Sequence, residues 1–170
     1  MRKKSSSGFT LVELLVVISI ICILSVVGIA SYINFSRSQT VTQTARKIVQ
    51  DMRLAQSLAN NGQKPEGCTG TLSSYTFDGT SLPSYTIFAT CTGDTTPITV
   101  KNDFVSSNLT FPGLNKVEFK VLNRGVTFDG FTGTPSMAQR TLSVSWASIG
   151  IGKSIVVDEG GSIKIQGEIP

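Results

Sequence analysis

The chain opens with a long apolar segment behind a short basic start. Residues 14–36 carry no charged side chain, and most of them are aliphatic. A run of about 20 apolar residues is long enough to cross a bilayer as one helix. The pattern therefore predicts a membrane-spanning helix over residues 9–33, with the carboxylate of Glu13 at its edge.

The helical pattern continues beyond this segment, now with a single apolar face. Apolar residues recur in alternating steps of four and three positions, as on one stripe of an amphipathic helix. Asn60, Asn61 and Gly62 predict the helix end, since glycine readily adopts the left-handed conformation found there. We therefore expect one helix over residues 9–60, in which residues 34–61 are amphipathic. The stripe comprises Val41, Ala45, Ile48, Met52, Ala55 and Ala59.

After residue 62 the pattern changes to short segments rich in Val, Ile, Thr and aromatic residues, separated by Gly, Pro, Asn and Asp. Such segments are typical of antiparallel strands. The predicted fold is α+β, with a long N-terminal helix whose outer half packs on an antiparallel β-sheet head over residues 62–170. Strands are expected within residues 85–92, 98–105, 116–122, 140–148, 153–159 and 162–167, hairpin connections at 94–97 and 158–161, and irregular structure at 62–74 and 129–139.

Charge adds an orientation and removes one class of function. The net charge is +4, but Arg2, Lys3 and Lys4 supply three of those charges, and the remaining basic residues are scattered. A nearly neutral head gives no reason to expect nucleic-acid binding. Basic residues beside a membrane helix stay on the cytoplasmic side, so the head should lie outside.

Two cysteines lie in the part expected outside the membrane, where disulfides persist. Cys68 and Cys91 are 23 positions apart, and closing such a loop is worth about 3 kcal/mol in the chain-entropy model. We expect a disulfide between them, with free thiols as the alternative. Two cysteines without a nearby histidine form an incomplete metal site, so no metal is expected.

The chain contains no histidine, the commonest general base and metal ligand. Its acidic residues mostly fall at predicted turns, where carboxylates are ordinary solvated groups. We therefore expect a protein that is not an enzyme and needs no cofactor.

The first fourteen residues resemble a known processing signal. A basic leader, Gly8 directly before Phe9, Glu13 five residues after the glycine, and then the apolar helix are similar to the prepilin signature of type IV pilins and type II secretion pseudopilins. The resemblance implies that residues 1–8 are a leader peptide, which a prepilin peptidase removes between Gly8 and Phe9 before methylating the Phe9 amine.

The same resemblance implies a role for Glu13 and a location for the protein. In that family the glutamate pairs with the terminal amine of a neighbouring subunit, so Phe9 and Glu13 would serve subunit assembly. The expected partners are the prepilin peptidase, other pilin or pseudopilin subunits and the cytoplasmic membrane. The chain would be a single-pass inner-membrane protein with its head outside, and later part of a cell-surface or periplasmic filament.

Some later stretches of the chain resemble a narrower group. Residues 51–59, 119–125, 142–145, 155–158 and 161–165 are similar to FimT/GspH-type minor pseudopilins, whereas residues 63–115 match no known pattern. Some members of that group bind DNA through a Gly-Arg-x-Arg motif. Here the corresponding positions are Gly161, Ser162, Ile163 and Lys164, without either arginine, so DNA is not expected as a partner.

The sequence thus predicts a structural minor pilin or pseudopilin of a type IV pilus or a type II secretion pseudopilus. Two alternatives stay open. One is a binding pilin at a filament tip, for adhesion or DNA uptake. The other is a membrane-anchored exported domain that never polymerises, for which cleavage after Gly8 would not occur.

Overall fold

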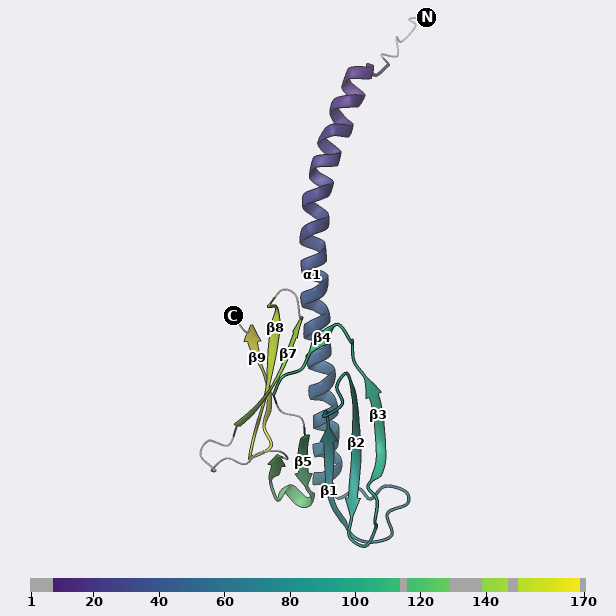
Figure 1. The fold of residues 1–170 in the computed structure, drawn as a ribbon, viewed down its shortest axis with the longest axis vertical. Coiled ribbons are helices and arrows are strands. Elements are labelled where there is room, and N and C mark those ends of the chain that lie inside the picture. The colour runs from purple at the N-terminus through teal and green to yellow at the C-terminus, as the bar shows by residue number, and fades with distance from the viewer. Residues whose placement is uncertain (1–7, 114–115, 129–138, 147–149, 169–170) are drawn as a thin grey trace, which may run out of the picture. The chain divides into compact units, whose positions relative to one another are not determined.

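The computed structural model describes residues 8–113, 116–128, 139–146 and 150–168 (Figure 1). The chain divides into two compact units, residues 1–37 and 38–170. The α+β prediction is confirmed, because an N-terminal helix is followed by antiparallel sheets. The elements are α1 (Leu11–Asn60), β1 (Leu72–Asp78), β2 (Ser84–Cys91), β3 (Ile98–Phe104), β4 (Leu109–Thr110), β5 (Lys116–Lys120), the 3-10 turn η1 (Val121–Asn123), β6 (Val126–Phe128), β7 (Gln139–Trp146), β8 (Gly152–Asp158) and β9 (Ile163–Glu168).

Helix α1 ends where the Asn-Asn-Gly sequence predicts. Gly62 has a positive φ of 59°. Its N–H donates to the carbonyl of Ala59, and the N–H of Gln63 donates to the carbonyl of Leu58. These two bonds form a Schellman motif, which satisfies carbonyls that the last helical turn leaves free.

The strands of the described residues form two sheets, where the sequence pattern predicted a single one. The first has the order β3-β2-β1-β5-β6 and the second the order β4-β7-β8-β9, and neighbouring strands are antiparallel in both. The expected hairpin connections at residues 94–97 and 158–161 join β2 to β3 and β8 to β9. The expected irregular stretch 62–74 is wrong at its end, because β1 begins at Leu72 and is the central strand of the first sheet.

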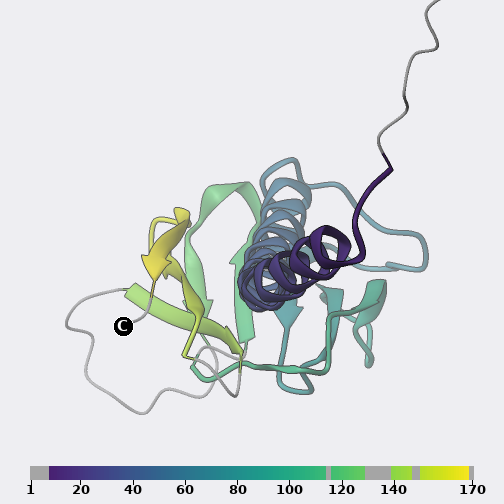
Figure 2. The ribbon, with the colours of Figure 1, turned by 90° about the horizontal axis from the view of Figure 1, so that it is seen from above.

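One hydrophobic core joins residues 38–60 of α1 to both sheets within the second unit. Figures 1 and 2 show strands of both sheets beside this part of the helix. The predicted stripe is confirmed, since all six of its side chains are fully buried. The core contains Tyr75, Phe77, Tyr85, Ile87, Val117 and Phe119 from the first sheet and Leu142, Val144, Ile155, Val157 and Ile163 from the second.

Among the described residues, no helix has the length and apolar character needed to span a membrane. Membrane anchoring over residues 9–33 therefore stays a prediction. Of the expected irregular stretch 129–139, residues 129–138 lie outside the described residues, and Gln139 is instead the first residue of β7.

Candidate functional site

The segment around the predicted cleavage site enters a helix through a specific cap. Helix α1 begins at Leu11, so Thr10 is the N-cap residue. The backbone N–H of Glu13 donates to the Thr10 hydroxyl oxygen at 3.3 Å, and the N–H of Leu14 donates to the Thr10 carbonyl at 3.2 Å. The Thr-x-x-Glu spacing is that of a capping box. Glu13 lies in the first helical turn, where the helix dipole favours a carboxylate.

The predicted scissile bond is open to an enzyme. A Cβ atom added at Gly8 would meet no heavy atom within 4 Å, and Phe9 is 81% exposed. Gly8, Phe9 and Glu13 therefore lie together at the exposed start of α1, as the sequence pattern implies. A peptidase could reach the peptide bond between Gly8 and Phe9 without unfolding the head.

The apolar side chains that follow are exposed in the isolated chain. A continuous apolar surface of this kind marks a face that a protein partner or a membrane covers. Two serine hydroxyls within the segment are satisfied by the helix itself: Ser19 donates to the carbonyl of Leu15, and Ser25 donates to the carbonyl of Ile21. The segment is thereby suited to apolar surroundings. Its exposed residues include Leu11, Val12, Leu14, Leu15, Val16, Ile18, Ile20, Ile21, Ile23, Leu24, Ile29 and Phe35.

A polar cluster attaches the head to the outer part of α1. The carboxylate of Asp51, a helix residue that is only 6% exposed, accepts hydrogen bonds from the hydroxyl of Tyr85 on β2 and from the ammonium of Lys101 on β3, the latter at 2.7 Å. Lys101 also lies 3.2 Å from Asp103. Lys47, one helical turn before Asp51, donates to Asp103 at 2.8 Å.

The cluster shifts the titration of its members. The hydrogen bond from Lys47 lowers the pKa of the Asp103 carboxyl well below its usual range, and the Phe104 backbone N–H adds to this effect. Burial, followed by the hydrogen bond to Asp51, raises the pKa of Tyr85. The hydrogen bond to Asp51 raises the pKa of Lys101. All three pKa shifts favour the protonation states that these side chains have at neutral pH, namely an ionised Asp103, a charged Lys101 and a neutral Tyr85.

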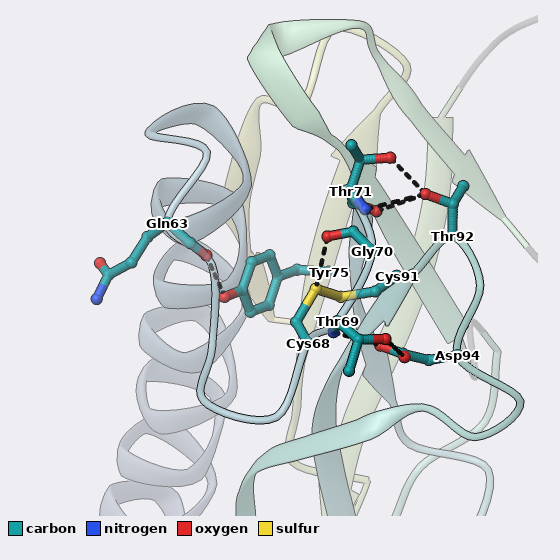
Figure 3. Close-up of a disulfide and its surroundings, with 9 residues drawn as sticks. All are labelled: Gln63, Cys68, Thr69, Gly70, Thr71, Tyr75, Cys91, Thr92 and Asp94. Atoms are coloured by element: carbon teal, nitrogen blue, oxygen red, sulfur yellow. Dashed lines mark hydrogen bonds between the residues drawn. A yellow bond between two sulfur atoms is a disulfide. The ribbon is translucent and has the colours of Figure 1, made fainter.

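The structure contains the predicted disulfide between Cys68 and Cys91 (Figure 3), which ties the loop after α1 to the end of β2. Nearby, the hydroxyl of Tyr75 donates to the backbone carbonyl of Gln63 at 2.6 Å. Burial raises the pKa of this tyrosine. Asp94 lies near both sulfur atoms, but sulfur atoms in a disulfide are not the thiolates that bind metals.

Two of the four positions that correspond to the DNA-binding motif, Gly161 and Ile163, contact side chains of the helix. Gly161 has a φ of 81°, and a Cβ there would come within 2.5 Å of the Gln56 amide nitrogen. The same Gln56 nitrogen donates to the Gly161 carbonyl at 2.7 Å, and Arg53 donates to the carbonyl of Ile163 at 3.0 Å. Two side chains of α1 therefore bind the backbone at the start of β9.

Sequence reasoning missed two features of this molecule. The N-cap role of Thr10 was readable from the Thr-x-x-Glu spacing. The partners of Asp51 were not readable, because Tyr85 and Lys101 lie 34 and 50 positions away and no local pattern links them.

Residues 3–29 match the family model of the prokaryotic N-terminal methylation motif. No curated protein and no solved structure matches the chain. The motif supports a type IV pilin-like or pseudopilin-like precursor. It implies processing by a prepilin peptidase and assembly with other pilins, and it suggests a membrane-anchored protein that later enters a surface or periplasmic filament.

Proposed function

We propose that the chain is a structural minor pilin or pseudopilin that is cleaved between Gly8 and Phe9, methylated at Phe9 and built into a type IV pilus or a type II secretion pseudopilus. One observation carries the proposal: the matched methylation motif leads directly into a helix whose apolar side chains are uncovered in the single chain. Neighbouring helices in a filament, or lipid before assembly, would cover this surface.

Glu13 acts in assembly through the amine that cleavage creates. An unpaired carboxylate in apolar surroundings is costly, and an ammonium from a neighbouring subunit removes much of that cost. Because Glu13 lies in the first turn of α1, one turn from Phe9, the pair also sets the axial register between subunits. The protein works as a structural part, with no catalytic activity and no cofactor.

Within the family, we assign the chain to the FimT/GspH-type minor pseudopilins. The resemblance over residues 51–59, 155–158 and 161–165 supports this assignment. Residues 51–59 lie at the end of α1, and the other two stretches lie in the β8–β9 hairpin, so each contributes side chains to the core.

The intact mass of the protein from membranes of its native host tests the processing step. Loss of residues 1–8 with the gain of one methyl group is the expected result. A full-length mass, or a cut after the apolar segment, would refute the proposal and favour the anchored domain that never polymerises.

Assembly needs a second experiment. Glu13→Gln keeps the size of the side chain but removes its charge. We expect this variant to be processed normally but to be absent from the filaments that are sheared off the cells. Glu66→Gln, in the exposed loop after α1, is the matched control and should be incorporated normally. Equal incorporation of both variants would refute the role of Glu13.

A further inference from the structure

A polar pocket lies in the head beside the disulfide. Its volume is about 370 Å³, and it is formed by the start of β1, the turn after β2 and the end of β5 with η1. Its lining includes three hydroxyl residues, Thr71, Ser73 and Thr92, and two cations, Lys120 and Arg124. This volume falls within the range of pockets that bind small molecules.

The two cations have no ion-pair partner in the part of the head that the structure describes. Among the described residues, neither Lys120 nor Arg124 forms an ion pair, and no acidic residue lines the pocket. Glu118, two positions before Lys120 on β5, accepts a hydrogen bond from Thr127 at 2.8 Å. The pocket therefore has a charge of about +2 that no carboxylate on its wall neutralises.

Three departures from regular backbone geometry meet at this pocket. Ser73 lies in a β-bulge between Leu72 and Ser74, which changes the direction of a side chain relative to the regular pleat. Leu122 in η1, between the two cations, has a positive φ of 56°, which is strained for a residue other than glycine. A Cβ on Gly70 would lie 1.5 Å from the carbonyl oxygen of Thr92, so only glycine allows this close approach between the segment before β1 and the residue after β2.

The hydroxyls differ in what they can offer. The hydroxyls of Thr71 and Thr92 bond to each other, and Thr92 also donates to the carbonyl of Thr71 at 2.9 Å (Figure 3). This pair holds the pocket wall in place. The exposed hydroxyl of Ser73 makes no hydrogen bond to the described residues, so it is available to a ligand as donor or acceptor.

A buried hydroxyl without a partner lies under the same wall. Ser74 is fully buried, and its Oγ atom has no hydrogen-bond partner among the described residues. Ser74 pairs directly with Lys120 across β1 and β5, so the two side chains share a face of the sheet. Polar groups in protein interiors are normally satisfied, and this one is left open beside a pocket residue.

We propose that this pocket binds an oxyanion, namely a carboxylate, phosphate or sulfate group carried on a small hydroxyl-bearing molecule such as an acidic sugar. The guanidinium of Arg124 suits a bidentate contact to such a group, and Lys120 supplies a second charge. Ser73 supplies a hydroxyl contact. No aromatic side chain among the described residues lines the pocket, so these residues offer no stacking platform for a nucleobase. This site is independent of processing at Gly8 and of filament assembly.

Calorimetric titration of the full chain in non-ionic detergent micelles tests this site, with sodium phosphate, sodium sulfate and sodium glucuronate as probes. Chloride keeps the ionic strength constant, because unspecific attraction to positive charge is screened by salt. The test variant is Lys120→Gln/Arg124→Gln. The matched control is Lys64→Gln/Lys164→Gln, which removes the same charge from exposed positions outside the pocket.

We expect saturable millimolar binding of at least one probe, weakened about tenfold or more in the test variant and unchanged in the control. Tighter binding of glucuronate than of phosphate would identify an acidic sugar as the source of the oxyanion. Tighter binding of phosphate than of glucuronate would identify a phosphoryl group as its source. The absence of saturable binding for all three probes, or equal weakening in test and control variants, would overturn the proposal. A urea unfolding midpoint equal to that of the parent chain, measured for both variants, shows that the head is folded.

Discussion

Replacement of Asp51 by alanine should weaken the packing of the head on α1 and lower the free energy of unfolding by about 2 kcal/mol. The hydroxyl of Tyr85, a residue that is only 1% exposed, would lose its carboxylate partner, and an unsatisfied buried donor costs about 1–3 kcal/mol. Lys101 keeps Asp103 as a partner at 3.2 Å, and its side chain is 34% exposed. The loss of its ion pair with Asp51 therefore adds at most about 1 kcal/mol. The better helix propensity of alanine returns about half a kcal/mol.

Urea unfolding of the full chain in detergent micelles measures this change. Trp146, the single tryptophan of the chain, is partly buried against the core and reports on the head by its fluorescence. Gln50→Ala, one position earlier on the exposed side of α1, is the matched control and should stay within about 0.5 kcal/mol of the parent chain.

A double-mutant cycle identifies the cause. Tyr85→Phe alone should cost about 1.5–3 kcal/mol, since one hydrogen bond to a charged group is lost while Lys101 still binds Asp51. The double variant Asp51→Ala/Tyr85→Phe should cost clearly less than the sum of the two single changes, because no hydroxyl is left unpaired. A cost below about 0.5 kcal/mol for Asp51→Ala, or strict additivity in the cycle, would refute this reasoning.

Three further changes test other parts of the fold by the same urea assay. The hydrogen bond from Lys47 lowers the pKa of Asp103 in the folded chain, so ionised Asp103 stabilises the head above its unfolded pKa of about 3.9, and this contribution is lost as pH falls through the folded pKa. Asp103→Asn should therefore lower the free energy of unfolding at pH 7 and flatten the loss of stability below about pH 4. An unchanged dependence of stability on acid pH would contradict this. Gly70→Ala should destabilise the head strongly, because its Cβ would overlap a backbone oxygen, whereas Gly167→Ala, with no atom within 4 Å, should be nearly neutral; equal midpoints would disprove the close approach. Ile48→Ala, at a fully buried position, should cost about 3 kcal/mol, and a cost under 1 kcal/mol would exclude tight packing there.

Strand β1 shows why part of the fold could not be predicted from the sequence. Tyr75 and Phe77 face the core, but Ser74 and Thr76 on the other face of the sheet are also buried. Small hydroxyl residues are typical of exposed or irregular chain, so Leu72–Asp78 has only a weak strand pattern. It becomes the central strand because β2 and β5 pair on its two sides, and these partners are set by the whole sheet.

The same distinction holds for the candidate sites. Gly8, Phe9 and Glu13 are neighbours in the chain, so their relation could be predicted from spacing alone. The oxyanion pocket unites residues from β1, the turn after β2 and the end of β5. Ser73 and Arg124 are 51 positions apart, and nothing in either local sequence points to the other.

The sequence by itself determined the processing signal, the single helix, its buried stripe and most of the strand segments. Each of these is a local pattern, fixed by the periodicity of one element or by the spacing of a short motif. Only the tertiary structure decided the division into two sheets, the partners of Asp51 and the pocket at Lys120 and Arg124. These depend on strand pairing and on contacts between residues far apart in the chain, which local periodicity does not encode.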